Sequence, residues 1–240
     1  MSLKILVTND DGIDAVGLEY LVEHAKKYGE VVVVAPLVEQ SAKSQAIEVR
    51  KKVLCTKVDK FPGVLAYAFD STPTDCVRFA RYGLHLDFDL ILSGINKGYN
   101  VGEDIWYSGT VAVAFEAKSL HAKAIAFSVI KSSNEGFKYF DETMEYILNN
   151  NLFDICDTYN VNLPSKAKGI KITRQGGNNF NTFYEEREKD MYMQCGDWVN
   201  DEDIDKTYID NIAINQGYIS IMPLTADRTD INAFNELLKK

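Results

Sequence analysis

Apolar runs and stretches of helical spacing alternate along the first two thirds of the chain. The apolar runs have little polar alternation, which is typical of strands covered on both faces, as in a parallel sheet. We predict such strands at 3–8, 31–36, 64–69, 88–92 and 124–129. We predict helices between or after them at 17–28, 73–82, 109–120 and 137–149, and strands or a hairpin excursion at 45–58. This order predicts a doubly wound α/β fold with right-handed crossovers.

Local signals place the ends of two of these helices. Thr72 is a good N-cap, Pro73 suits the first helical position, and Asp75 suits the positive end of the helix that follows. Gly29 follows a lysine pair and is a candidate C-cap for the helix over 17–28. The sequence therefore predicts a helix beginning at Pro73 and another ending just before Gly29.

The last third of the chain has a different pattern. Short β-like runs replace the long alternation, at 161–164, 169–175, 178–198 and 217–224. With 240 residues, we expect one domain over 1–240, with a core at 1–165 that carries the site and a β-rich extension with a helix at 166–240. We expect this extension to be antiparallel and to serve association between copies of the chain.

Charge and composition restrict the partners. No apolar run is long enough to cross a membrane, and no signal segment opens the chain, so we expect a cytoplasmic protein without a membrane partner. The net charge of −9 disfavours binding of long nucleic acid, but a bound cation could still admit a small phosphorylated ligand. The cysteines form no C-x-x-C pair and predict neither a zinc site nor a disulfide framework; they are Cys55, Cys76, Cys156 and Cys195.

The segment TNDDG places two carboxylates, Asp10 and Asp11, after the first predicted strand. In open α/β sheets the carboxyl edge is where ligands bind. If the chain turns before Gly12, both carboxylates can converge, and they would repel one another unless a cation lies between them. The alternative is that one aspartate caps the next helix while the other faces water.

Three more loops should emerge at the same edge of the sheet: EQSAKS, SGINKGYN and YSGTVAVA. Ser41 and Asn96 would add a hydroxyl and an amide carbonyl to the two carboxylates, and such an oxygen set suits Mg²⁺ or Mn²⁺. Alternatively, Ser41 is a plain turn residue and Asn96 a left-handed turn residue. Gly94 and Gly98 indicate a backbone that approaches something closely.

The start of the helix over 109–120 is a candidate anion site. Ser108, Gly109 and Thr110 precede small residues, so free N–H groups and two hydroxyls would face the crevice. Ordinary N-capping by Ser108 is the alternative. Other chemistries have less support, since the sequence has no G-x-G-x-x-G after its first strand, no Walker loop and no G-x-S-x-G elbow. None of the histidines, His24, His85 and His121, falls in these loops.

Seven segments in order resemble the motifs of the SurE survival proteins, which are nucleoside monophosphate phosphatases. They are ILVTNDDGIDAVGL, AP with the loop serine, STPTDCV, SGINKGYNVGEDIWYSGTVAVAFEA, VNLP, ITRQG and GYISIMPL, and they span nearly the whole chain. The resemblance implies a Rossmann-like α/β core with a parallel or mixed sheet flanked by helices. It also implies homodimers or homotetramers joined by exchanged carboxyl-terminal segments, and a role in stationary-phase survival.

The resemblance also implies the chemistry and the roles of single residues. It implies hydrolysis of nucleoside 5′- and 3′-monophosphates with one divalent cation per subunit, Mg²⁺ or Mn²⁺. By position, the metal ligands are Asp10, Asp11, Ser41 and Asn96, with both aspartates catalytic. The substrate-binding residues are Asn9, Asn100, Ser108, Gly109 and Thr110.

One segment departs from the family pattern. Family members usually carry D-R-x-x-S-G around the serine, whereas this chain has LVEQSA at 37–42. This difference bears on the substrate range, and it is the best support for a non-catalytic sensor that binds metal and nucleotide. A metal-dependent glycosyltransferase is the enzymatic alternative, and the attacking group in a phosphatase, water or an aspartate, stays open.

Overall fold

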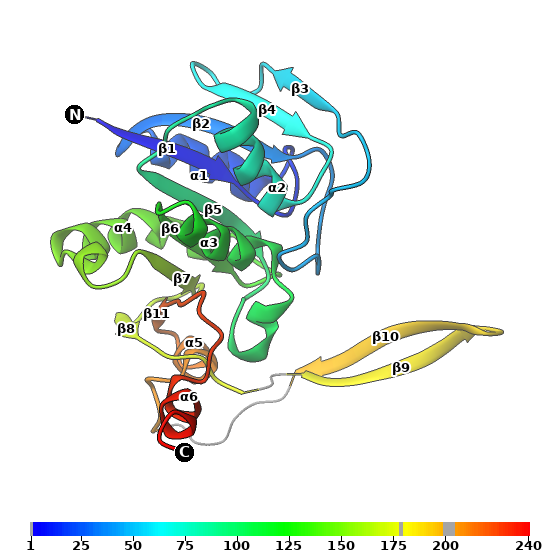
Figure 1. Ribbon diagram of the computed structural model, residues 1–240, viewed down its shortest axis with the longest axis vertical. Coiled ribbons are helices and arrows are strands. Elements are labelled where there is room, and N and C mark those ends of the chain that lie inside the picture. Colours follow the sequence, from blue (N-terminus) through cyan, green and yellow to red (C-terminus); the bar gives the residue numbers. More distant parts are fainter. Residues whose placement is uncertain (1, 178–179, 199–204) are drawn as a thin grey trace.

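The computed structural model describes residues 2–177, 180–198 and 205–240. Its centre is a mixed sheet with the strand order β3-β4-β2-β1-β5-β6-β7-β11-β8 (Figure 1). The strands of this sheet are β1 Leu3–Thr8, β2 Gly29–Pro36, β3 Cys55–Val58, β4 Leu65–Phe69, β5 Leu90–Lys97, β6 Lys123–Val129, β7 Thr158–Leu163, β8 Ile170–Ile172 and β11 Ile219–Pro223. All pairings from β4 through β7 are parallel, which confirms the predicted α/β core.

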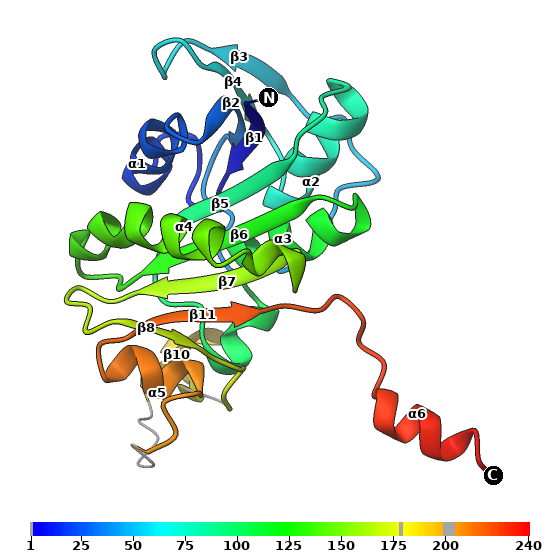
Figure 2. The same cartoon turned by 90° about the vertical axis from the view of Figure 1, so that its left-hand side faces the viewer.

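Helices cover both faces of this sheet (Figures 1 and 2). On one face, α1 Val16–Ala25 and α4 Phe140–Asn149 bury apolar side chains with those of β1, β2 and β5 to β7. On the other face, α2 Pro73–Arg78 and α3 Gly109–Ser119 form a second apolar core. Because each face of the central strands is buried, the strands read as continuous apolar runs.

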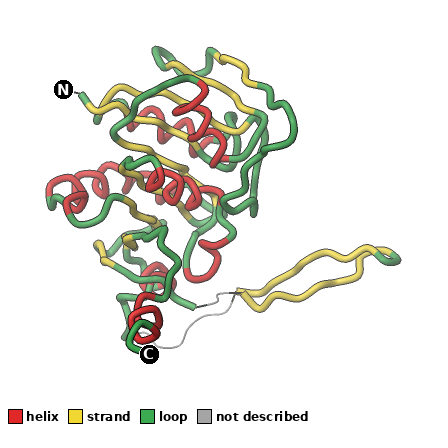
Figure 3. Tube along the Cα trace, viewed as in Figure 1, coloured by secondary structure: helices red, strands yellow, loops and turns green. Residues whose placement is uncertain are grey.

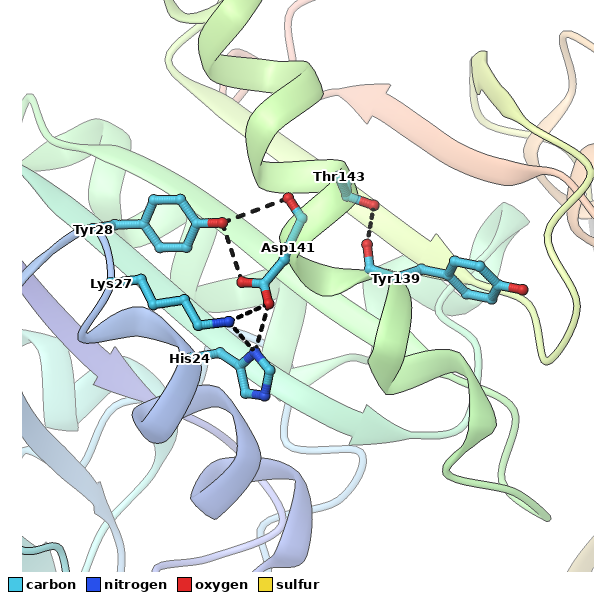
Figure 4. Close-up of polar contacts among 6 residues, drawn as sticks. All are labelled: His24, Lys27, Tyr28, Tyr139, Asp141 and Thr143. Atoms are coloured by element: carbon cyan, nitrogen blue, oxygen red, sulfur yellow. Dashed lines mark hydrogen bonds and ion pairs between the residues drawn. The ribbon is translucent and has the colours of Figure 1, made fainter.

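A polar cluster joins the two helices of the first face (Figure 4). The Asp141 carboxylate of α4 lies 2.8 Å from His24 Nδ1 and 2.5 Å from Lys27 Nζ, and Tyr28 donates its hydroxyl to it at 3.1 Å. Burial alone would raise the pKa of Asp141, but the hydrogen bonds from Lys27 and His24 outweigh it and lower this pKa. The cluster fixes the end of α1 against α4.

The strand order places a topological switch at β1. The chain builds β2 and β4 on one side of β1 and then β5, β6 and β7 on the other. In such sheets the loops at the carboxyl ends of the two strands beside the switch separate and leave a crevice. The loops after β1 and β5 are therefore at the position where a ligand is expected.

The extension differs in part from the prediction. Strand β11 is antiparallel to β7, but β8 is parallel to β11, so both strands widen the central sheet. Strands β9 Phe180–Glu188 and β10 Met191–Trp198 form a separate antiparallel hairpin that projects from the body (Figure 3). The predicted β-like segment 178–198 begins with two residues that lie outside the described ones. The short helices α5 Asp210–Asn215 and α6 Ile231–Leu237 complete the extension.

Several element boundaries also differ. Gly29 opens β2, where it pairs with Leu3 of β1, instead of capping a helix. Glycine suits this position because a Cβ atom there would lie 2.1 Å from the Leu3 carbonyl oxygen. Only Cys55–Val58 of the predicted excursion at 45–58 is a strand, since side-chain bonds from the α2 region hold Ala46 and Glu48 in a loop. Thr72 caps α2 as predicted, but the helix continues as a π-helix at Phe79–Gly83.

Two further observations concern the whole described chain: the state of its cysteines and the character of its helices. All four cysteines are free, in agreement with the absence of a disulfide framework. In the ranges that the structure describes, no helix combines the length and the apolar character that a membrane crossing requires.

Candidate metal and phosphate site

The end of β1 packs directly against the start of α3. Asp10 follows β1 and is buried, with 4% of its surface exposed. The Thr110 hydroxyl donates to Asp10 Oδ1, and the Thr110 N–H donates to Oδ2 at 3.2 Å. Two of the sequence-predicted site residues, 100 positions apart, are therefore in direct contact.

Gly109 makes this junction close-packed. A Cβ atom at Gly109 would lie 3.0 Å from Asp10 Cβ and 3.1 Å from Pro73 Cγ. Contacts this short leave no room for a side chain without moving its neighbours. Gly109 thus lets the beginning of α3 reach the carboxylate.

The first N–H groups of α3 are mostly engaged. Ser108 Oγ accepts the Val111 N–H at 3.1 Å, so Ser108 is an N-cap, the alternative raised from the sequence. The Thr110 N–H is directed at Asp10. Within the described part of the chain, the Gly109 N–H has no hydrogen-bond partner, which leaves one donor at the positive end of this helix for an anion. The start of α3 therefore offers an anion fewer free N–H donors than the sequence suggested.

Asp11 is only half buried and lies beside the end of β5. Its Oδ2 accepts the Lys97 N–H at 3.3 Å. Burial raises the pKa of Asp11, the Lys97 bond opposes this, and the negative charge of Glu39 raises it further. Neighbouring Asn96 donates Nδ2 to the Gly98 carbonyl at 2.7 Å, which orients its side chain.

The loop after β2 approaches the same two aspartates. The Gln40 N–H donates to the Asp10 carbonyl at 2.7 Å, so the loop backbone is fixed against TNDDG. Ser41 is exposed, and its hydroxyl donates to Glu39 Oε1 at 2.5 Å. Ala42 has a φ of 56°, a conformation that favours glycine, the residue that usually stands at this position in the resembling family.

The backbone around Gly94 and Gly98 explains why glycine stands at both positions of SGINKGYN. A Cβ atom at Gly94 would lie 2.4 Å from the Phe127 carbonyl oxygen of β6, and Gly98 has a φ of 140°. The close approach expected from the sequence is thus an approach to the neighbouring strand. Lys97, which follows on the same strand, is the residue that contacts Asp11.

The side chains fit a hard divalent cation. The carboxylates of Asp10 and Asp11 are adjacent, and burial, with the charge of Asp11 as a smaller cause, raises the pKa of Asp10 to about 6. Asn9 Oδ1 is buried without a hydrogen-bond partner among the described residues, while its Nδ2 donates to Gly12 O at 2.9 Å. Buried carboxylates and an unpaired carbonyl oxygen are groups that a cation would stabilise.

The donor set also argues for the class of metal. Among the residues that the structure describes, nowhere do three histidine, cysteine, aspartate or glutamate side chains gather to hold a metal. A site at TNDDG would therefore need hydroxyl or amide ligands besides its two carboxylates, and oxygen ligands of this kind suit Mg²⁺ or Mn²⁺ better than zinc.

Asn100 is held by hydrogen bonds to residues of β6 and β7. Its Nδ2 donates to Ser128 Oγ of β6 at 2.8 Å, and its backbone N–H donates to Asn162 Oδ1 of β7 at 2.9 Å. Asn160 and Asn162 both donate to its carbonyl at 2.8 Å. Sequence reasoning missed these two asparagines, although two amides alternating in an otherwise buried strand, TYNVNL, are an unusual signal.

The pKa of Asp10 predicts a pH-dependent stability of the chelator-treated protein. The folded pKa of about 6 exceeds the ordinary aspartate value of 3.8, so the folded state binds the proton more tightly and its stability falls as the pH rises from about 4 to about 6. Asp10→Asn removes this penalty of about 3 kcal/mol at neutral pH. We expect the variant to gain about 2 kcal/mol more in free energy of unfolding at pH 7.5 than at pH 4.5.

Urea unfolding in chelator at the two pH values measures this difference. Asp14→Asn is the matched control, because the Asp14 carboxylate is exposed and, among the described residues, pairs with Lys60 alone, at 2.7 Å. An Asp10→Asn advantage that is equal at both pH values would contradict the expected titration.

Comparison with known proteins shows the family of this chain. A family model described as Survival protein SurE matches residues 5–182. The 5′-nucleotidase SurE of Natranaerobius thermophilus is 36% identical over 98% of this chain and 97% of its own length. That of Petrotoga mobilis is 34% identical over 98% of each chain. The crystal structure of the SurE protein from Aquifex aeolicus covers 99% of this chain and 100% of its own, with a TM-score of 0.80 and 32% identity.

The family match extends over well more than half of the chain, and the relatives match it at nearly full length. The matched range includes β1, the loop after β2, β5 and the start of α3, which carry the site described above. The chain belongs to the SurE family of survival proteins.

Proposed function

We propose that this protein is a phosphomonoesterase that hydrolyses nucleoside 5′-monophosphates, and also 3′-monophosphates, to nucleoside and phosphate with one divalent cation per subunit. One observation carries the proposal: the buried Asp10 carboxylate is held by the start of α3, and Asp11 lies next to it on the side of β5. The names of the relatives, 5′-nucleotidase SurE, support the reaction.

The side chains divide into two roles in this proposal. Asp10, Asp11, Ser41 and Asn96 would hold the cation, directly or through water. When bound, it would neutralise charge on the phosphoryl oxygens and lower the pKa of a water molecule. Thr110 keeps the Asp10 carboxylate oriented, while the Gly109 N–H offers a donor to the phosphate.

The remaining substrate contacts are assigned by position. Ser108 can still donate its hydroxyl hydrogen, since its oxygen only accepts from Val111. Asn100 keeps a second Nδ2 hydrogen beyond the bond to Ser128, and Asn9 has its free Oδ1. These groups and the Gly109 to Thr110 segment would contact the phosphate ester and the ribose.

The experiment that tests the function is a chelation and reconstitution assay. After treatment with chelator, phosphate release from a panel of 5′- and 3′-nucleoside monophosphates is measured with and without added Mn²⁺ or Mg²⁺. We expect release only with metal, and more from the 5′ esters. Protein that is folded and metal-loaded yet silent across the panel would instead indicate a sensor.

The sensor has one structural observation in its favour. Glu39 accepts the hydroxyl of Ser41, so a residue peculiar to this chain's LVEQSA loop engages a proposed metal ligand. In the sensor, metal and nucleotide binding would persist without turnover. Binding of nucleotide to the metal-loaded protein by calorimetry, next to the turnover assay, separates the two functions.

We also propose that the extension joins subunits into a homodimer or homotetramer. Large apolar side chains are exposed on the hairpin and on α6, among them Phe183, Tyr184, Met193, Phe234 and Leu237. Large apolar side chains exposed on projecting elements are groups that association between subunits would cover.

A further inference from the structure

The loop after β5 is held in place by residues that are distant in the sequence. It runs from Gly98 to Gly102, carries Asn100, and leads into the 3₁₀ helix Gly102–Trp106. Both backbone groups of Asn100 are hydrogen-bonded to the side chains of Asn160 and Asn162. A short loop whose backbone is satisfied by buried side chains has little freedom to move.

A row of polar residues under this loop runs across the sheet. Asn96 of β5 pairs with Ser128 of β6, Ser128 with Asn162 of β7, and Asn162 with Ser220 of β11. Ser220 Oγ in turn lies 2.8 Å from Thr173 Oγ1. Residues paired in neighbouring strands share one face of the sheet, so this row connects a proposed metal ligand with the extension.

The far end of the loop is held by a carboxylate of the extension. Asp210, the first residue of α5, is fully buried. Its Oδ2 accepts the Gly102 N–H at 2.8 Å, and its Oδ1 accepts the N–H groups of Gly176 and Asn211, each at 2.8 Å. No cationic side chain in the described ranges forms an ion pair with it.

A buried carboxylate without a neighbouring cation needs other groups to stabilise its negative charge. Burial raises the pKa of Asp210, and the hydrogen bonds from Gly102 and Gly176 oppose this rise. The three backbone donors stabilise the charged form, which in return fixes the three backbone segments around it. A single side chain thus ties the loop at Gly102 to the segment at Gly176 and to α5.

We propose that Asp210 is a positioning residue, which holds the Asn100–Gly102 loop of the site to the extension through its bond to the Gly102 N–H. The extension then has a task within its own subunit besides association. The activity part of this inference rests on the proposed nucleotidase function, while the anchoring of the loop does not.

Asp210→Asn is the informative variant. Two N–H groups converge on Oδ1 and only one on Oδ2, so the amide oxygen takes the place of Oδ1 and the NH₂ group faces Gly102. The substitution therefore removes the acceptor of the Gly102 N–H and preserves the others. Asp230→Asn is the matched control: Asp230 also accepts a backbone N–H, from Ala233 at 2.9 Å, but at the start of α6 and away from the loop.

The first measurement is amide hydrogen exchange, which needs no activity. In the wild-type protein we expect the N–H groups of Asn100 and Gly102 to be protected like those of β7, although they lie in a loop. In Asp210→Asn the exchange of residues 99–104 should accelerate about tenfold or more, with β1 and β6 unchanged. Fast exchange at Gly102 in the wild type would overturn the proposal even if the variant does not fold.

The second measurement is the kinetics of the metal-loaded enzyme. We expect kcat/KM for a nucleoside 5′-monophosphate to fall about tenfold or more in Asp210→Asn and to stay at the wild-type value in Asp230→Asn. The Kd for Mn²⁺ should stay unchanged, because Asp10 and Asp11 keep their contacts. Faster amide exchange in Asp210→Asn with an unchanged kcat/KM would reject the positioning role. An inactive wild-type protein would reject the proposed function, and the exchange experiment would still test the anchoring of the loop.

Discussion

Asp11→Asn is expected to lower kcat/KM for nucleoside 5′-monophosphates by about a thousandfold or more, with no loss of thermal stability. Asp11 is the more accessible of the two carboxylates and makes one long hydrogen bond, 3.3 Å from Lys97 N. In the proposed function, its charge would therefore be available to a divalent cation. Because burial and Glu39 raise its pKa, loss of this charge does not destabilise the fold.

Steady-state kinetics at saturating Mn²⁺, together with the melting temperature, test this result. Asp14→Asn is the matched control, since it removes a carboxylate three positions away whose side chain is exposed and, among the described residues, pairs with Lys60 alone. The control should retain wild-type kcat/KM. An Asp11→Asn enzyme with near wild-type activity would reject the assignment of the site.

Gly17→Ala should destabilise the protein by about 3 kcal/mol, although alanine is the better helix former. Gly17 lies in the first turn of α1, where a Cβ atom would be 2.0 Å from the Ile95 carbonyl oxygen and 3.0 Å from its carbon. Both are backbone atoms of β5, so no side-chain rotation can relieve the overlap. Helix α1 must move away from β5, and buried contacts of the first core are lost.

The expected change is a fall in melting temperature of about 6–12 °C for a chain of this size. Gly177→Ala is the control, because a Cβ atom there has no neighbour within 4 Å. Its melting temperature should stay within about 1 °C of the wild type. A Gly17→Ala protein as stable as this control would show that α1 does not approach β5 so closely.

Asp11→Asn is expected to change activity and Gly17→Ala to change stability, because the two residues lie in different parts of the fold. Asp10 and Asp11 lie at the edge of the sheet, where their charges oppose stability, as the raised pKa values of both carboxyls indicate. Gly17 and Gly94, by contrast, lie where two backbone segments are in close contact, with Ile95 and with Phe127 respectively. Residues of the first kind can be changed at little cost to folding, and residues of the second kind cannot.

The sequence by itself determined the elements and named candidate site residues in single loops. Apolar runs are local patterns, and buried parallel strands need them, so β1, β2, β4, β5 and β6 were each predicted near their observed positions. The cap at Thr72 was equally local, because capping involves atoms within three residues. The TNDDG carboxylates were recognised by their place after a strand.

Only the tertiary structure decided which groups meet. The bond of Thr110 to Asp10 spans 100 positions, and that of Gly102 to Asp210 spans 108. No local pattern encodes such pairs, since they depend on the strand order and on close backbone approaches such as that at Gly109. Asn160, Asn162 and Asp210 were not named as site residues from the sequence, because their burial and their backbone partners are apparent only in the folded chain.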